Sequence, residues 1–289
     1  MSSLPNQNIG LYLCENQGWE RALIYFWKKY GHGNLIAVQH STVRYWDLRY
    51  FDDPRGSISK NILAQPLPDK IAINGAAAWK MYENANQLMN KMIKVEALRY
   101  LHLGKFNPSV NHSNKKDIYG MKKILILGDI NKNTTNSMLE LLNSISLFLS
   151  DGWDLIMKPH PANQIKLGDY PNINITITDK PLEQLLPNFE ISIASIFTSA
   201  SLEVFLAGLN VITVLDDNDF NFSSLRGIQG VPFVSTAGEL EMALIECLAN
   251  PFVKNTDDFF WTDSELPRWK DLLGFDQKHT AEKITTNIN

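Results

Sequence analysis

The stretch Lys158-Pro159-His160-Pro161 places an amine and an imidazole in one short, proline-flanked segment. Two prolines one residue apart are incompatible with a helix and predict an extended loop around His160. The largely apolar residues 153–157 just before it, Trp-Asp-Leu-Ile-Met, predict a buried strand. Ligands of parallel α/β sheets bind at the carboxyl ends of strands. Lys158 and His160 are therefore candidate phosphate ligands, and His160 is also a candidate general acid toward a leaving phosphate. Lys158 fits a solvated strand end equally well.

A second loop of this kind follows the apolar run Ile191–Ala194 and opens a helical pattern. It carries the hydroxyl residues Thr198, Ser199 and Ser201. Hydroxyls and backbone N–H groups at the start of a helix bind anions, although the same residues can serve only to cap the helix. Glu203 suits the first turn because of the helix dipole, and its carboxylate could also accept hydrogen bonds from ribose hydroxyls. The two loops together predict a pocket for a phosphate-bearing donor.

The candidate catalytic bases are Glu15, Glu20 and His40. Glu15 follows a predicted strand that ends at Cys14, and His40 follows the next one, which ends at Val38. A strand, helix, strand order with short loops indicates parallel strands. Glu15 and His40 should then lie at the same edge of a sheet. The alternative is that Glu20 is a solvated helix residue and His40 a hydrogen-bonded loop residue.

The rest of the pattern alternates strands and helices, which predicts an α/β fold of two Rossmann-like domains. Thr236 and either Asn133 or Thr134 are predicted helix caps. The predicted strands are Ile9–Cys14, Leu35–Val38, Lys70–Asn74, Lys123–Leu127, Asp154–Met157, Ile173–Ile177, Ile191–Ala194, Val211–Leu215 and Phe233–Val234. The predicted helices are Trp19–Tyr30, Ala76–Met92, Thr135–Leu149, Pro181–Leu186, Leu202–Ala207 and Ala237–Leu248.

The predicted boundaries give a partial N-terminal domain over residues 1–105 and a polar linker over 106–121. A second α/β domain follows over 122–250, and 251–289 form a tail that packs back on the body. Only about three strand–helix units precede the linker, so we expect a shortened N-terminal domain.

Composition limits the function classes. The chain has 289 residues, 44% of them hydrophobic and 20% charged, and a net charge of −4, which argues against nucleic-acid binding. Two distant cysteines, Cys14 and Cys247, make a disulfide framework unlikely and fit a reducing cytoplasm. We expect a cytoplasmic protein, with contact at the inner face of the membrane left open by tryptophans beside basic residues. The acidic run 216–219 lacks a second acidic cluster, so no metal and no resident cofactor are expected.

The succession Gln39-His40-Ser41, Lys158-Pro159-His160-Pro161 and 195–212 resembles the two-domain GT-B glycosyltransferases of bacterial surface-carbohydrate assembly. More narrowly, it is similar to transferases of CMP-linked nonulosonates or Kdo and to CDP-glycerol glycerophosphotransferases. Residues 11–23 and 38–51 are similar to a family of surface carbohydrate biosynthesis proteins. The resemblance implies that His160-Pro161 and the Ser199/Ser201 loop hold the nucleotide phosphate. It also implies that residues 1–105 form the acceptor-side domain and residues 122–250 the nucleotide-sugar-binding domain. The catalytic histidine of the His-Gly motif in the CDP-glycerol enzymes would fall on His40, where Ser41 replaces the usual glycine.

The resemblance implies a glycosyltransferase that moves a sugar, favoured as a CMP-linked 2-keto sugar, to a surface glycan or glycolipid acceptor. The acidic motif of the CMP-sugar enzymes matches residues 15–18 only loosely, which leaves the identity of the base open. One alternative is a nucleotide-sugar epimerase of the same architecture. The other is a truncated, non-catalytic nucleotide-binding homologue.

Overall fold

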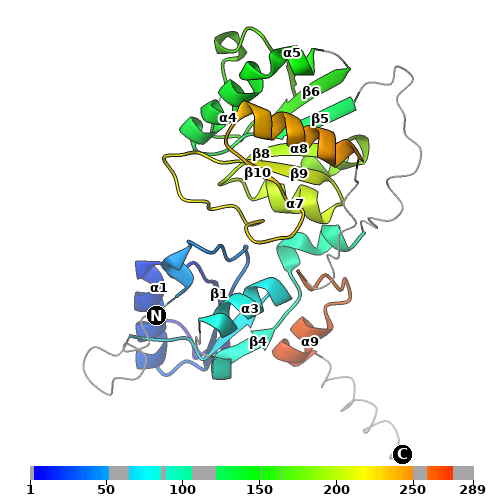
Figure 1. Ribbon diagram of the computed structural model, residues 1–289. Coiled ribbons are helices and arrows are strands. Elements are labelled where there is room, and N and C mark those ends of the chain that lie inside the picture. The colour runs from blue at the N-terminus through cyan, green and yellow to red at the C-terminus, as the bar shows by residue number, and fades with distance from the viewer. Residues whose placement is uncertain are drawn as a thin grey trace, which may run out of the picture. The chain divides into compact units, whose positions relative to one another are not determined.

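The computed structural model describes residues 3–51, 65–85, 89–105, 122–150, 152–163, 165–249 and 259–275. The chain divides into two compact units, each with its own parallel sheet (Figure 1). The N-terminal unit comprises Met1–Val43, Asp47–Lys105 and Asp257–Asn289, and the C-terminal unit comprises Arg44–Trp46 and Phe106–Thr256. The predicted linker, 106–121, lies outside the described residues, as do 276–289 of the predicted tail.

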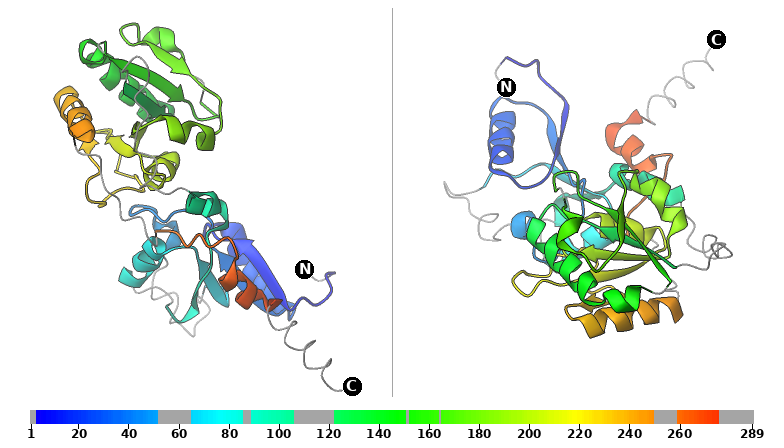
Figure 2. Two further views of the ribbon diagram at one scale, coloured as in Figure 1. Left: turned by 90° about the vertical axis from the view of Figure 1, so that its right-hand side faces the viewer. Right: turned by 90° about the horizontal axis from the view of Figure 1, so that it is seen from above.

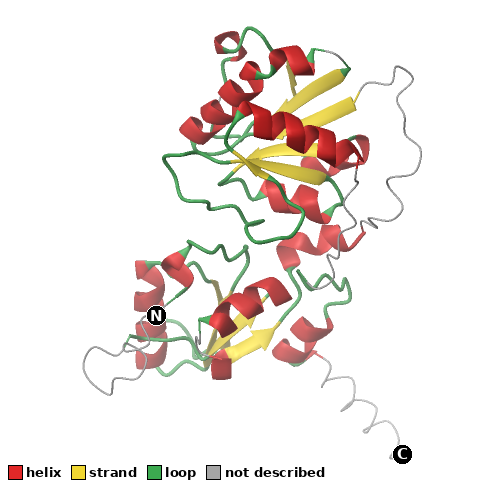
Figure 3. Ribbon diagram, in the orientation of Figure 1, coloured by secondary structure: helices red, strands yellow, loops and turns green. Residues whose placement is uncertain are grey.

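The C-terminal unit is built on a six-stranded sheet in the order β10-β9-β8-β5-β6-β7, and every neighbouring pair is parallel. The strands are β5 (Lys122–Leu127), β6 (Trp153–Lys158), β7 (Ile175–Ile177), β8 (Ile191–Ser195), β9 (Asn210–Val214) and β10 (Phe233–Val234). The helices are α4 (Lys132–Ser144), α5 (Ser146–Leu149), α6 (Leu182–Leu185), α7 (Ala200–Leu206) and α8 (Ala237–Ala249). Figure 3 shows helices layered against these strands, as predicted for 122–250.

β5 is the central strand of this unit. Its last four residues, 124–127, form a continuous apolar run, and each is at most 1% exposed. Such a run without alternation is typical of a strand that is covered on both faces. The strand order changes direction at β5, because β6 lies on one side of it and β8 on the other. Right-handed crossovers then place α4 and α7 on opposite faces of the sheet.

The N-terminal unit has a smaller, four-stranded parallel sheet in the order β1-β2-β3-β4. Its elements are β1 (Ile9–Leu13), α1 (Gly18–Lys29), β2 (Asn34–Val38), β3 (Lys70–Ile73), α3 (Ala76–Asn84), β4 (Met92–Lys94) and α9 (Pro267–Leu273). The turns of 3-10 helix lie at Leu48–Tyr50, Met89–Lys91 and Leu98–Lys105 here, and at Leu167–Asp169 and Leu186–Asn188 in the C-terminal unit. Two Rossmann-like units, the first one smaller, are what the sequence predicted.

α9 comes from the end of the chain and completes the core of the N-terminal unit. Trp269 packs against the buried side chains Ile36, Ala72 and Val95. Its indole N–H donates to the carbonyl oxygen of Glu96 at 2.8 Å, and its backbone N–H donates to the Glu96 carboxylate at 3.2 Å. That carboxylate, which is fully buried, also pairs with Arg268 at 2.9 Å. A buried charge is tolerated only when it is paired and hydrogen-bonded in this way.

Two details of the sequence prediction were wrong. The helix predicted over Ala76–Met92 ends at Asn84, and Met92 opens the unpredicted strand β4, which pairs with β3. A free strand edge beside β3 outweighed the helical composition of this segment. The cap of α4 is Asn131, whose side chain accepts a hydrogen bond from the backbone N–H of Asn133.

Candidate functional site

The ends of β5, β6 and β8 are joined through one buried residue, Asp129, which immediately follows β5 and Gly128. One of its oxygens accepts hydrogen bonds from the hydroxyl of Ser195, the last residue of β8, at 2.5 Å and from the backbone N–H of Phe197, in the loop after β8, at 3.0 Å. The other accepts from the Asn131 backbone N–H at 3.1 Å. Asp129 is 0% exposed, so these bonds replace all of its hydration. They fix the loop that leads to Ser199.

Asp129 also holds the loop after β6. Its carbonyl oxygen accepts a hydrogen bond from the Asn163 side-chain amide at 2.9 Å. Gly128 allows the loop after β6 to approach the end of β5, since a Cβ on Gly128 would lie 3.0 Å from the Pro159 Cα and 3.1 Å from the His160 backbone nitrogen. The loops of His160 and Ser199 are therefore both tied to the end of β5, one on each side.

His160 is half-buried in the loop after β6. Its Nδ1 accepts a hydrogen bond from the Ala162 backbone N–H at 3.2 Å. An imidazole nitrogen that accepts a hydrogen bond carries no proton, so the neutral ring has its proton on Nε2. His160 is thus set up to donate a hydrogen bond from Nε2, which is the role that a phosphate ligand requires.

The hydroxyls of the predicted anion loop differ in their surroundings. Ser199 is the N-cap residue of α7, but its side chain makes no capping hydrogen bond, and it is half-buried. Ser201 is fully buried, and its hydroxyl donates to the Thr198 carbonyl oxygen at 2.8 Å. Thr198 is 9% exposed. Of the three, Ser199 is the hydroxyl that this loop leaves for a ligand, and Ser201 braces the turn.

The remaining two residues of the predicted donor site lie at its borders. The Lys158 amine donates to the Lys180 carbonyl oxygen at 2.8 Å, in the loop after β7. In this conformation Lys158 links two strand ends. Glu203 lies in the first turn of α7 and is half-buried, as predicted for a carboxylate near a helix start.

The N-terminal unit brings Glu15 and His40 together at the ends of β1 and β2, which are neighbouring parallel strands. His40 Nε2 lies 3.5 Å from the Glu15 carboxylate, and the two side chains are 24% and 44% exposed. Such a pair can accept and pass on a proton. Glu20 is 1% exposed and accepts the backbone N–H groups of Glu15 and Gln17, each at 2.9 Å. It is not the solvated helix residue that we considered, but a buried brace for the Glu15 loop.

Beside this pair lie buried acceptors that no described residue satisfies. They are the side-chain oxygens of Gln39 and Asn74 and the Nδ1 of His40. The amide nitrogens of Gln39 and Asn74 both donate to the carbonyl oxygen of Ser41. Buried polar atoms nearly always have a partner, so these atoms at the ends of β2 and β3 suit an internal water.

Asp216, in the predicted acidic run, is engaged in hydrogen bonds. The backbone N–H of Asn218 donates to it at 2.9 Å and the Ser137 hydroxyl at 3.0 Å, and these bonds lower the pKa of its carboxyl. Within the described ranges no three His, Cys, Asp or Glu side chains are grouped so that they could hold a metal ion. In the same part of the chain, no helix has the length and apolar character needed to cross a bilayer.

No protein-family model matches this chain, and no curated protein matches its sequence. Solved structures do. The UDP-GlcNAc 2-epimerase from Methanocaldococcus jannaschii has a TM-score of 0.56 at 14% identity, over 93% of this chain and 77% of that one. The glycotransferase of kitacinnamycin has a TM-score of 0.54 at 14% identity, over 84% and 68%. The MnaA–UDP co-structure from S. aureus has a TM-score of 0.54 at 9% identity, over 85% and 68%.

At these identities the similarity establishes the fold, a GT-B-like pair of Rossmann-like units, which confirms the predicted fold class. The comparisons do not test the narrower resemblance to CMP-sugar and CDP-glycerol enzymes. Both glycosyl transfer and epimerisation occur on this architecture, so the fold by itself does not choose between them.

The sequence analysis did not single out Asp129, Asn163 or Asn74 as site residues. Asp129 could have been suspected, because it directly follows a buried strand and a glycine, at the edge where α/β proteins bind ligands. Nothing local marks Asn163 or Asn74, since their hydrogen-bond partners lie 33–34 residues away in the sequence.

Proposed function

We propose that the chain is a GT-B-type glycosyltransferase that binds the phosphate of a nucleotide sugar at the carboxyl ends of β5, β6 and β8. The observation that carries this proposal is the buried Asp129, which holds the His160 and Ser199 loops on the two sides of β5. A conformation fixed before the ligand arrives loses little entropy on binding. Asp129 also lies where the strand order reverses, between β6 and β8, and open α/β sheets bind ligands at such a switch point.

In the proposed reaction, an acceptor hydroxyl attacks the anomeric carbon as the bond from that carbon to the donor phosphate oxygen breaks. The departing nucleotide takes the electron pair, and negative charge grows on its phosphate. The Nε2–H of His160 and the hydroxyl of Ser199 would stabilise that charge as fixed donors. The acceptor proton would pass to the Glu15–His40 pair.

The narrower parts of the proposal concern the substrates. We favour a CMP-linked 2-keto sugar as donor because of the Lys158-Pro159-His160-Pro161 and serine-loop patterns. A surface glycan or glycolipid is the proposed acceptor.

A nucleotide-sugar 2-epimerase is the second candidate, because two of the similar structures are a UDP-GlcNAc 2-epimerase and a protein solved with UDP. An epimerase converts its nucleotide sugar without an acceptor. Incubating the protein with UDP-GlcNAc alone, and analysing the products by mass spectrometry and NMR, separates the two activities. A changed sugar without acceptor would favour the epimerase.

Calorimetric titration with CMP, CDP, UDP and GDP tests the donor site. A hydrogen bond to a charged group is worth about 1.5–3 kcal/mol, so His160→Ala should weaken the preferred nucleotide by about one to two powers of ten. Glu15→Gln should leave that affinity nearly unchanged and reduce sugar transfer, which makes it the matched control. Equal affinity of the wild type and His160→Ala for every nucleotide would refute the proposal that the donor phosphate binds at the loop after β6.

A further inference from the structure

The edge of the N-terminal sheet at β1 has the features of a surface built to receive another strand. β1 is the last strand in its sheet, paired only with β2. The Cys14 backbone N–H donates to Val38 of β2, and hydrogen-bonding direction alternates along a strand. The N–H and C=O groups of Ile9, Leu11 and Leu13 therefore point to the edge where the described residues place no strand.

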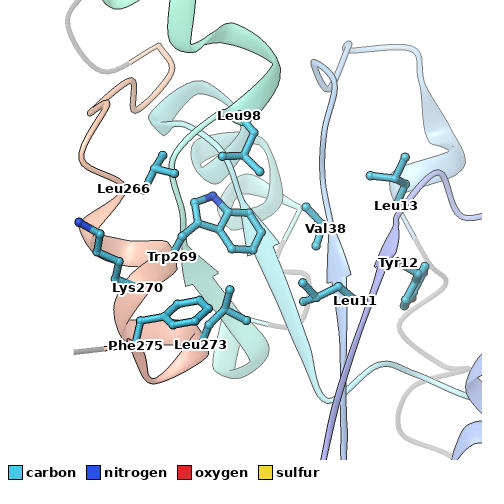
Figure 4. Close-up of a pocket in the computed structure, with 10 residues that line it drawn as sticks. All are labelled: Leu11, Tyr12, Leu13, Val38, Leu98, Leu266, Trp269, Lys270, Leu273 and Phe275. Carbon is cyan, nitrogen blue, oxygen red and sulfur yellow. The ribbon is translucent and has the colours of Figure 1, made fainter. Parts of the chain in front are cut away.

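Natural proteins protect such edges with charges, prolines or bulges. β1 has none of these, because its sequence is Ile-Gly-Leu-Tyr-Leu. It is instead exposed and apolar on the face away from α1, where Ile9 is 40%, Leu11 46% and Leu13 56% exposed. On that face a hollow of about 580 Å³ separates β1 from α9, with Leu11 and Leu13 on one side and Trp269 on the other (Figure 4).

On its other face the same edge is lined by an aromatic stripe of α1. Trp19, Phe26 and Tyr30 recur at helical spacing and are 56%, 40% and 43% exposed. Arg21 follows Trp19 by two residues and Lys28 follows Phe26 by two residues, which puts both basic side chains on the opposite side of the helix from the stripe. Arg21 donates to the carbonyl oxygen of Pro66 and Lys28 to that of Leu67, and both acceptors lie just before β3.

The stripe therefore faces away from β3 and out beyond β1. It is held in a defined shape, since Phe26 and Tyr30 stack at 6.2 Å and Trp19 packs on Tyr12 of β1 at 6.3 Å. Aromatic side chains bury about 150–250 Å² each, so the exposed parts of these three amount to about 250 Å². A standard interface buries roughly 800 Å² per partner, and the strand edge with its three aliphatic side chains supplies much of the remainder.

We propose that β1 pairs with β1 of a second copy of this chain, antiparallel and about a two-fold axis perpendicular to the sheet. In the register centred on Leu11, that residue lies opposite its own copy, and Ile9 lies opposite Leu13. All exposed apolar residues of the strand then pair with one another, and no charge on β1 opposes a like charge. The same axis sets the α1 stripes of the two copies side by side, with their helix dipoles antiparallel.

Sedimentation of the full chain from about 1 to 100 µM, the range of ordinary dimer affinities, tests this proposal. We expect reversible dimers, and we expect Leu11→Lys and Phe26→Lys each to weaken dimerisation by about tenfold or more. Leu11→Lys puts a charge against its own copy, and Phe26→Lys puts a charge into the apolar contact between the two stripes. Leu147→Lys is the control, since Leu147 is 90% exposed on α5. Circular dichroism of all variants should match the wild type, and so should melting at concentrations below the dimer range, because the substituted positions are exposed in one chain.

The register is tested by Leu11→Cys under mild oxidation. Directly opposed, hydrogen-bonded residues of antiparallel strands have Cα atoms about 5.5 Å apart, within the range of a disulfide. Leu11→Cys should form a cross-linked dimer, and the wild type, which retains Cys14 and Cys247, should not. A monomeric wild type, a dimer indifferent to Leu11→Lys and Phe26→Lys, or cross-linking no better than in the wild type would overturn the proposal.

Discussion

Replacing Asp129 by asparagine removes one charge and keeps the shape of the side chain. The two oxygens of Asp129 accept from three donors, the Asn131 and Phe197 backbone N–H groups and the Ser195 hydroxyl. A carboxamide has a single oxygen. In either orientation its NH₂ group faces a backbone N–H, so Asp129→Asn leaves at least one buried donor without an acceptor.

The cost follows from that count. A hydrogen bond to a charged acceptor is worth about 1.5–3 kcal/mol, and a buried donor left unsatisfied costs about 1–3 kcal/mol. The two figures describe overlapping losses, so we expect the free energy of unfolding of the C-terminal unit to fall by about 3 kcal/mol. For a unit of this size that corresponds to a decrease in Tm of roughly 6–12 °C. Asp129→Ala should cost more, because it removes the acceptor for all three donors.

Calorimetric melting and urea unfolding measure the loss, with Asp217→Asn as the matched isosteric change at an exposed carboxylate. Nucleotide affinity should fall in parallel, since the loops of His160 and Ser199 lose their common anchor. Stability of Asp129→Asn within about 0.5 kcal/mol of the control, the range of ordinary surface changes, would refute the assigned role of this residue.

Three further changes test other parts of the structure. Glu96→Gln should destabilise the N-terminal unit by about 2–4 kcal/mol in urea unfolding, because it leaves the Arg268 guanidinium without its carboxylate; an unchanged midpoint would mean that α9 contributes little. Gly128→Ala should lower both the Tm and nucleotide affinity, since its Cβ would crowd the Pro159 backbone, whereas Gly238→Ala, with open space around it, should be neutral or stabilising. The pKa of Asp216 is lowered in the folded state, so its contribution to stability is present above its ordinary value of 3.8 and is lost as the pH falls through the folded value. The loss of stability on acidification from pH 5 to 3 should therefore be smaller in Asp216→Asn, and an identical pH profile would contradict that shift.

Much of the fold could be predicted because it depends on local sequence. Apolar runs that stop at Gly, Pro or polar residues marked nine of the ten strands in the described part of the chain, and alternation with helices implied parallel sheets. Parallel pairing in turn put Glu15 and His40 at one edge, as the register of β1 and β2 confirms. The strand that was missed, Met92–Lys94, is three residues long and follows a helix-like segment, so no periodicity could reveal it.

The inner construction of the candidate site could not be predicted, since its contacts are distant in the sequence. Asp129 meets Ser195 and Phe197 66 and 68 residues later. A single acidic residue after a strand shows no sequence pattern from which such distant hydrogen-bond partners could be predicted. Ser201 shows the opposite difficulty, because its type suggested a ligand while its burial and its bond to Thr198 give it a structural role.

The contribution of α9 to the N-terminal unit has a consequence for biosynthesis. The ribosome completes the C-terminal unit before it makes Arg268 and Trp269, so until then Ile36, Ala72 and Val95 lack the side chain that covers them. Glu96 likewise lacks its ion-pair partner Arg268, which is synthesised 172 residues later. The unit that is synthesised first must therefore finish folding last, and during that interval its uncovered sheet face is a target for chaperones and for aggregation. A nonsense mutation or protease cut ahead of residue 267 would leave the N-terminal unit permanently in that state, even though most of its own sequence is intact.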